Sequence, residues 1–240
     1  MGLVEVGLTA YAETYKGSTV LWYYRTGVAT VSWKGKSFSV TLTADNSRDG
    51  KFYVDDSLFV KAFGVGDEKL VVYQDAVTKN VSIRANFCFS GDAANMVPKT
   101  KGLFYKTHFR QGVEEYWRGT FEGYSVSTYT GEHKNGIRVD IANAYGRSTL
   151  YPAVFRWSKD NVGSIKMTMG HSSINPYTVS WFRWAAAHEF GHVLGVDDAY
   201  NSKSSSGKGG IFDAIYNRVQ QKDMDMVLRA WSTGRWQKWS

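Results

Sequence analysis

The residues best suited to chemistry lie in one segment, WAAAHEFGHVLGVDDAY, which spans residues 184–200. His188 and His192 are four residues apart, so on a helix both imidazoles project from the same face, about one turn apart. At this separation, two neutral imidazole nitrogens can reach one Zn²⁺ at about 2.0–2.1 Å each. Glu189 lies beside the first histidine, where its carboxylate can reach a water on the metal rather than the metal itself. Because zinc lowers the pKa of such a water from about 15.7 towards 7, the segment predicts a metal site with a general base.

Residues after the second histidine extend the pattern to HExxHxxGxxD. Gly195 comes three residues after His192, and Asp198 comes three residues later. Glycine tolerates a positive φ and can end a helix with a sharp turn, after which the chain swings back. The sequence therefore predicts Asp198 as the third zinc ligand. Asp197 is the competing carboxylate, and the spacing favours Asp198.

A solvated helix face is the alternative interpretation of the two histidines. Trp181, Trp184 and Ala185 share that face, which indicates that the histidines point towards the core. Imidazoles without partners carry a desolvation cost in such surroundings, and a bound metal removes that cost. The metal site is therefore the better interpretation of the pattern.

The elements that must position this segment begin near residue 77. Apolar alternation or helical spacing predicts a strand at 81–89, a helix at 106–121 and further strands at 136–143, 151–157 and 164–170. Asn175 and Pro176 are suited to a cap and a first helical residue, so they predict the start of the histidine-bearing helix. A final apolar stripe predicts a C-terminal helix with Met224 in the core: Met224, Val227, Leu228 and Trp231. This order predicts a mixed fold of strands and helices.

The first 76 residues have a pattern of short strands and turns that differs from the rest of the chain. Residues 28–33 and 37–42 read as two strands of a hairpin, joined by the turn Lys34-Gly35-Lys36. The segment 64–69 (GVGDEK) is the best candidate for a linker. We therefore expect a β-rich N-terminal domain at 1–76, acting as an accessory or pro-domain, and a second domain at 77–240.

Composition excludes several classes of protein. A chain of 240 residues with 43% hydrophobic residues is not disordered. The sequence contains no run of about 20 apolar residues, so no membrane span is expected. The single cysteine, Cys88, excludes an intramolecular disulfide and a cysteine metal cluster. The net charge of +7 is spread along the chain, which indicates a solvated surface rather than a nucleic-acid site. The first residues show no basic leader and no apolar run, so we expect no signal peptide in the chain as given.

The run His188, Glu189, His192, Gly195 and Asp198 resembles the metzincin zinc peptidases. More narrowly it resembles the snapalysin-like variants, in which aspartate replaces the usual third histidine. The resemblance covers roughly residues 77–236 and implies an α+β or α/β fold. That fold has a twisted mixed sheet, a first helix, the zinc-site helix and a small C-terminal subdomain that ends in a helix. It also implies a Zn²⁺ cofactor, hydrolysis of peptide bonds in protein or peptide substrates, a monomer and a secreted, extracellular protein.

Two further expectations come with the resemblance. The substrate would lie extended beside an edge strand, for which residues 164–170 (SIKMTMG) are the candidate. A tyrosine near a turn beneath the zinc hydrogen-bonds the oxyanion in some metzincins, so Tyr216 is a candidate catalytic residue. An ordinary packed tyrosine is the alternative for Tyr216.

One position departs from the metzincin pattern. Metzincins carry a methionine in the turn beneath the zinc, and Ile215 stands at the position that we match to it. We interpret this as a tolerated change, since isoleucine can fill the same apolar space. The departure keeps open a catalytically silent, metzincin-like binding or structural protein.

The leading interpretation is a zinc endopeptidase with Glu189 as general base. A zinc hydrolase that acts on another bond is less favoured, because Gly195 and Asp198 match the peptidase pattern. Zymogens of metzincins can use an acidic side chain to cover the zinc, so Asp55 or Asp56 is the candidate if residues 1–76 form a pro-domain.

Overall fold

The fold is described from a computed structural model. It describes residues 3–7, 12–15, 18–23, 27–33, 36–41, 43, 47–48, 51–55, 68–74, 79–98, 102–121, 123–146, 148–151, 157–170, 178–199 and 210–239. The described part is a mixed α+β structure with one large sheet, three helices and two small N-terminal sheets.

The large sheet has seven strands in the order β10-β11-β9-β12-β14-β13, with β8 also paired to β9. The strands are β8 (Leu70–Gln74), β9 (Asn80–Ser90), β10 (Gly119–Phe121), β11 (Tyr124–Glu132), β12 (Ile137–Ala142), β13 (Thr149–Tyr151) and β14 (Ser164–Thr168). Four of them, β11, β9, β12 and β14, run parallel. The short strands β10 and β13 and the strand β8 pair antiparallel. The predicted strands at 81–89, 136–143 and 164–170 are confirmed.

β9 lies in the middle of this sheet. One of its edges pairs with β11, and the other is shared by β8 and then β12. Its apolar positions from Val81 to Phe87 are buried as predicted, and Phe89 is half-buried. Ser82, Arg84 and Asn86 on the opposite face are buried too. Asn86 also donates through Nδ2 to the carbonyl of Glu68, at 2.8 Å. The prediction of a half-buried strand was therefore wrong, because both faces of β9 are covered.

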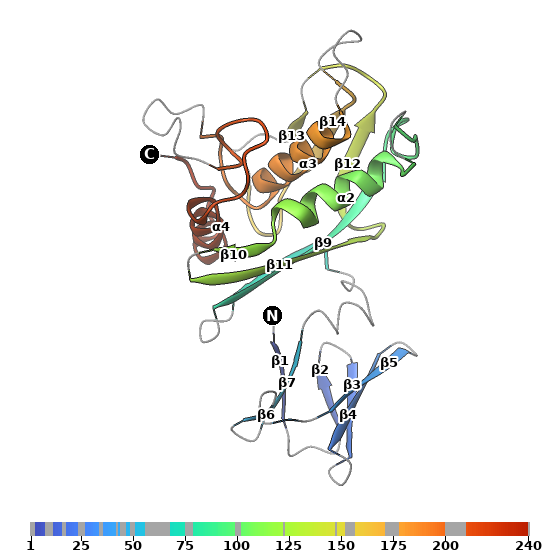
Figure 1. The fold of residues 1–240 in the computed structure, drawn as a ribbon, viewed down its shortest axis with the longest axis vertical. Helices are drawn as coiled ribbons and strands as arrows, with labels where there is room; N and C mark the ends of the chain where they lie inside the picture. Colours follow the sequence, from blue (N-terminus) through green and yellow to red (C-terminus); the bar gives the residue numbers. More distant parts are fainter. Residues whose placement is uncertain are drawn as a thin grey trace.

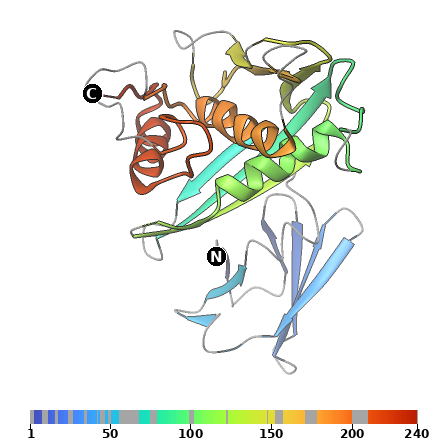
Figure 2. The ribbon, with the colours of Figure 1, turned by 45° about the horizontal axis from the view of Figure 1, so that its top comes forward.

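Two long helices lie side by side over one face of the sheet, as Figures 1 and 2 show: α2 (Tyr105–Tyr116) and α3 (Val179–Val193). Aromatic rings fill the layer between helices and sheet. The ring of Phe87 on β9 lies 5.1 Å from that of Phe109 on α2 and 5.8 Å from that of Phe190 on α3. None of the described helices is long and apolar enough to cross a membrane.

α2 is shorter than its sequence pattern predicts. The helix ends at Tyr116 with Trp117 as its C-cap, and Gly119 adopts a φ of +142°. Gly119–Phe121 then forms β10, where a helix was predicted up to residue 121. The chain leaves the helix here because these residues pair with β11 instead.

α4 (Gln221–Thr233) closes the fold beyond α3. It begins with a capping box between Gln220 and Asp223, and it ends at Gly234, whose φ is +68°. Met224 is fully buried, which confirms the prediction that it is a core residue.

The N-terminal part forms two small antiparallel sheets. One has the order β1-β7-β6 and the other β2-β3-β4-β5. Their strands are β1 (Leu3–Gly7), β2 (Ala12–Tyr15), β3 (Ser18–Tyr23), β4 (Val28–Trp33), β5 (Lys36–Thr41), β6 (Ser47–Arg48) and β7 (Lys51–Asp55). β4 and β5 form the predicted hairpin, with Val31 opposite Phe38.

The predicted domain boundary at residue 76 separates two strands that are paired. β8 lies before that boundary and pairs with β9, which lies after it, so the large sheet begins no later than Leu70. The division into two domains stays a prediction, with its boundary before β8. Most of the predicted linker, residues 64–67, lies outside the described residues.

Candidate metal centre

α3 carries three of the predicted site residues. Thr178 is its N-cap and accepts a hydrogen bond at Oγ1 from the backbone N–H of Trp181, at 3.1 Å. The predicted start at residues 175–176 lies outside the described residues. His188, Glu189 and His192 are all buried, and the two imidazole rings lie 4.8 Å apart, centroid to centroid.

A glycine bend after α3 brings Asp198 back to the histidines. Gly195 has a φ of +99°, and a Cβ there would lie 2.6 Å from the ring of Trp157, so both the backbone and the packing require glycine. Asp198 Oδ1 lies 3.1 Å from His188 Nε2 and 3.3 Å from His192 Nε2. Asp197, the competing carboxylate, accepts the backbone N–H of Asp198 at Oδ1, at 2.9 Å. The structure therefore brings His188, His192 and Asp198 together, with Asp198 rather than Asp197 as the third member of the triad.

The second ring nitrogen of each histidine fixes its tautomer. His188 Nδ1 lies 2.9 Å from the carbonyl oxygen of Ile211, and His192 Nδ1 lies 2.7 Å from that of Val196. A carbonyl only accepts, so each Nδ1 carries the proton and donates. In the neutral imidazoles both Nε2 lone pairs then face Asp198, which is the orientation that metal-binding histidines take.

The three converging atoms fit a divalent cation. Two Nε2 lone pairs and one carboxylate oxygen all accept, so a cation or additional protons must lie among them. The candidate ligand atoms of the three residues lie within 4.8 Å of one another. In a tetrahedral zinc site with bonds of 2.0–2.1 Å, ligand atoms are about 3.3 Å apart. The two Asp198 distances of 3.1 and 3.3 Å match this spacing.

The charges of the triad depend on one another. Burial raises the pKa of Asp198, but hydrogen bonds to His188 and His192 outweigh burial and lower it below its ordinary value. Burial lowers the pKa of His192, and the hydrogen bond and charge of Asp198 outweigh burial and raise it. Without a metal, the carboxylate therefore stays ionised and favours a proton on the imidazole of His192. A divalent cation would replace that proton.

Glu189 is positioned beside the triad with an unused carboxylate oxygen. Its side chain is 6% exposed, and among the described residues its Oε2 has no hydrogen-bond partner. Burial raises the pKa of Glu189, while the neighbouring histidines lower it. A buried carboxylate with a raised pKa and a free oxygen is suited to exchanging a proton with a water near the metal.

Phe212, rather than Ile215, lies against the two histidines. Phe212 is fully buried, with its ring 5.9 Å from that of His188 and 5.6 Å from that of His192. Gly191 leaves room for it, since a Cβ there would lie 2.4 Å from Cζ of Phe212. Ile215 is 52% exposed, so the prediction that it fills this apolar space was wrong. The turn returns to the site three residues earlier than the sequence match assumed.

Tyr216 lies at the rim of the site. It is 52% exposed and has a φ of +66°, a conformation that non-glycine residues rarely adopt. Its ring lies 6.4 Å from that of Trp184, which in turn lies 5.1 Å from His188. Its catalytic role stays a prediction.

The other described histidines contact residues outside the triad. His108 is buried between α2 and α3, where Arg183 donates to its Nδ1 at 3.3 Å, and His133 accepts from the backbone N–H of Asn135. Cys88 is half-buried in β9, opposite Arg138 of β12. His171 and Asp56 lie outside the described residues, as does the side chain of Asp55, whose backbone ends β7.

The sheet edge nearest to the site is β13, not β14. β14 was predicted as the edge strand, but it pairs with β12 on one side and with β13 on the other. β13 is the outer strand of this edge among the described residues. It is only three residues long, so its sequence carries too little alternation to predict it, and the strand expected at 151–157 begins earlier, at Thr149.

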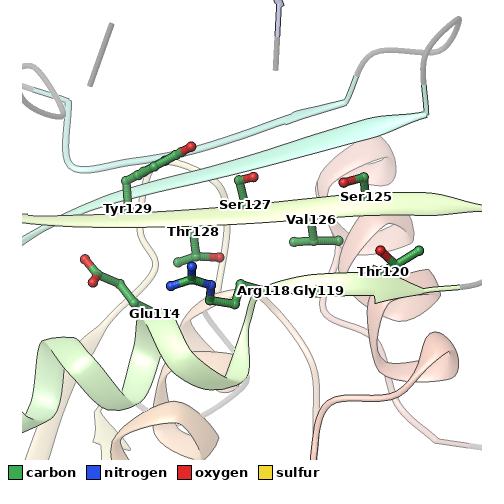
Figure 3. Close-up of a pocket in the computed structure, with 9 residues that line it drawn as sticks. All are labelled: Glu114, Arg118, Gly119, Thr120, Ser125, Val126, Ser127, Thr128 and Tyr129. Carbon is green, nitrogen blue, oxygen red and sulfur yellow. The ribbon is translucent and has the colours of Figure 1, made fainter. Parts of the chain in front are cut away.

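A separate cavity of about 500 Å³ lies where α2 ends beside β10 and β11 (Figure 3). Its lining is mostly polar: Glu114, Arg118, Gly119, Thr120 and Ser125–Tyr129. In Figure 3, Ser125, Ser127 and Tyr129 project from one face of β11, and Val126 and Thr128 from the other. The cavity shares no residue with α3 or with the bend that carries Asp198, so it is not part of the metal centre.

The groups that hold the histidines could not be identified from the sequence. The carbonyls of Ile211 and Val196 and the ring of Phe212 contact them, and so does Trp236, whose ring stacks on His192 at 6.1 Å and 24°. Metal-binding histidines need an acceptor for the second nitrogen, so the sequence implied that such groups exist. It carried no signal of which residues supply them.

No protein-family model and no curated protein matches the chain. Among solved structures, the crystal structure of metalloproteinase-II from Bacteroides fragilis is similar at 11% sequence identity. The match covers 91% of this chain and 84% of that chain, with a TM-score of 0.30. A similarity at this level does not assign an activity to the chain.

Proposed function

We propose that the chain is a zinc-dependent endopeptidase of the metzincin type, which hydrolyses peptide bonds in protein substrates. The convergence of His188, His192 and Asp198, with buried Glu189 beside them, carries this proposal. The HExxHxxGxxD spacing supports it, because the bend at Gly195 brings Asp198 back to the two histidines.

The three ligands and the base would divide the work as follows. His188, His192 and Asp198 would hold the zinc, and their Nδ1 and backbone contacts orient them in advance. Bound zinc supplies a Lewis acid that activates a water and polarises the peptide carbonyl. Glu189 takes a proton from the attacking water and passes it to the departing amine. Burial raises the pKa of Glu189, which makes its carboxylate a stronger proton acceptor.

A peptide substrate would bind in an extended conformation along β13. Edge strands offer unpaired backbone groups to which an extended peptide can add as a further strand. β13 is the outer strand on the side of the sheet next to α3. Tyr216, exposed beside Trp184, would contact the bound substrate or the oxyanion. We also propose that the chain acts outside the cell, as the metzincins that its motif resembles do.

Cleavage of casein with and without a chelator tests the proposal. We expect zinc-loaded protein to cleave casein, chelated protein to be inactive, and zinc to restore cleavage. Protein that binds zinc without cleaving casein or a mixture of unstructured peptides would support the silent, metzincin-like binding protein instead. Cleavage that persists in excess chelator would contradict the role of the metal.

A further inference from the structure

The chain segment after α4 returns to the bend that carries Asp198. Gly234, with its positive φ, turns the chain out of α4, and Gln237 then pairs with Val196 as a parallel bridge. The backbone N–H of Gln237 donates to the carbonyl of Gly195 at 2.8 Å, and the N–H of Asp197 donates to the carbonyl of Gln237 at 2.9 Å. Backbone hydrogen bonds to Gln237 therefore hold the bend at residues 195–197 in place.

Trp239 completes the contact with a side chain. Its indole Nε1 donates to the carbonyl oxygen of Asp197, at 2.9 Å. The indole is 7% exposed, with the ammonium group of Lys222 4.9 Å from its ring centre. Asp197 is thus bound on both sides of its backbone, at N–H by Gln237 and at the carbonyl by Trp239.

The backbone on the other side of Asp198 is held as well. The N–H of Ala199 donates to the carbonyl of Phe212, at 3.0 Å. Trp236, in the same returning segment, stacks its indole on the imidazole of His192. The segment after α4 therefore contacts His192 directly and fixes the backbone that orients Asp198.

We propose that residues 236–239 form a positioning segment for the metal centre, in which Trp239 acts on the metal through Asp198. This inference rests on the metal site of the proposed function. A carboxylate on a short bend binds a metal more tightly when its backbone is already ordered, because ordering the backbone on binding has an entropic cost. The indole of Trp239 provides that order by fixing the peptide group directly before Asp198.

Zinc affinity of Trp239→Phe tests the inference without any substrate. The substitution deletes the N–H donor and keeps an aromatic ring against Lys222. We expect the dissociation constant for zinc to rise about 10- to 100-fold, the range found when groups that orient a ligand are removed. The absorption spectrum of the Co²⁺ form should shift as well, because the carboxylate ligand loosens.

Trp231→Phe is the matched control. Trp231 also donates through its indole to a backbone carbonyl, that of Leu194, at 3.1 Å, but this carbonyl does not adjoin Asp198. We expect near wild-type zinc affinity for this variant. An equal loss in Trp231→Phe and Trp239→Phe would show general loosening and overturn the inference.

A double-mutant cycle shows whether Trp239 acts through Asp198. In the Asp198→Ala background, Trp239→Phe should change zinc affinity by no more than about twofold, the limit of additivity for independent sites. The same loss in both backgrounds, or no loss in either, would overturn the inference. If Trp239→Phe does not fold, Gln237→Pro deletes the N–H that Gly195 accepts and carries the same expectation. Wild-type protein that binds no zinc would overturn the metal site and this inference together, whereas zinc binding without proteolysis would overturn only the proposed activity.

Discussion

The ring of Phe212 lies 5.6 Å from the imidazole ring of His192, centroid to centroid. The same ring lies 5.9 Å from that of His188. The backbone carbonyl of the preceding residue, Ile211, accepts from His188 Nδ1. Two successive residues thus support the histidines, one through an apolar ring and one through a hydrogen bond.

Phe212→Ala tests this support. The substitution empties a fully buried site, and we expect a loss of about 3–5 kcal/mol in the free energy of unfolding. Ile215→Ala, three residues later in the same turn, is the matched control, and we expect a loss of about 0.5 kcal/mol or less because Ile215 is half exposed. Urea unfolding of the chelated proteins measures both values. A larger loss for Ile215→Ala would restore Ile215 as the residue beneath the site.

Glu189→Gln tests the role of the base. Glutamine keeps the shape of the side chain but takes no proton, so we expect the rate of casein cleavage to fall by about 10²- to 10⁴-fold. Zinc content should stay at the wild-type level, because Glu189 is not among the three ligands. Metal analysis and initial rates on the same preparation check both parts. Loss of zinc together with activity would place Glu189 among the ligands instead.

Asp223 predicts a pH dependence of stability. Its carboxylate is fully buried and accepts from the backbone N–H groups of Gly210, Ile211 and Gln220. Burial raises its pKa from 3.8 to about 6, although these hydrogen bonds act in the opposite direction. Between these two values the folded chain holds a proton that the unfolded chain has released. The contribution of Asp223 to stability is therefore complete below about pH 4 and is lost as the pH rises through 6, by roughly 3 kcal/mol.

The ¹³C resonance of the Asp223 carboxyl group measures this directly. In chelated protein we expect it to titrate with a midpoint near pH 6. The difference in unfolding free energy between wild type and Asp223→Asn should shrink over the same pH range. A midpoint at or below pH 4 would contradict the expectation and show that the three N–H donors outweigh burial.

The sequence predicted the parts of this structure that depend on local pattern. The four-residue spacing of His188 and His192 and the glycine at 195 are local features, and the structure places them on a helix and on a bend with positive φ. The alternating residues of β9 likewise predicted its buried apolar face.

The parts that failed depend on contacts between distant segments. Phe212 reaches the histidines only because the chain returns to α3 after residue 209, and no local pattern tells which residue of that return is buried. β13 is too short to show alternation, and it forms because β14 offers it an edge. The polar residues of β9, such as Asn86, are buried by neighbours that their own sequence does not reveal.

Zinc stoichiometry tests the central claim most directly. We expect purified wild-type protein, loaded with zinc and dialysed, to retain one zinc per chain, and we expect Asp198→Ala to retain clearly less and to lose casein cleavage with it. Asp197→Ala is the matched control: its carboxylate is not among the three candidate ligands and accepts from the backbone N–H of Asp198, so this variant should retain more zinc than Asp198→Ala. Full zinc in Asp198→Ala, or none in the wild type, would contradict the metal centre described here.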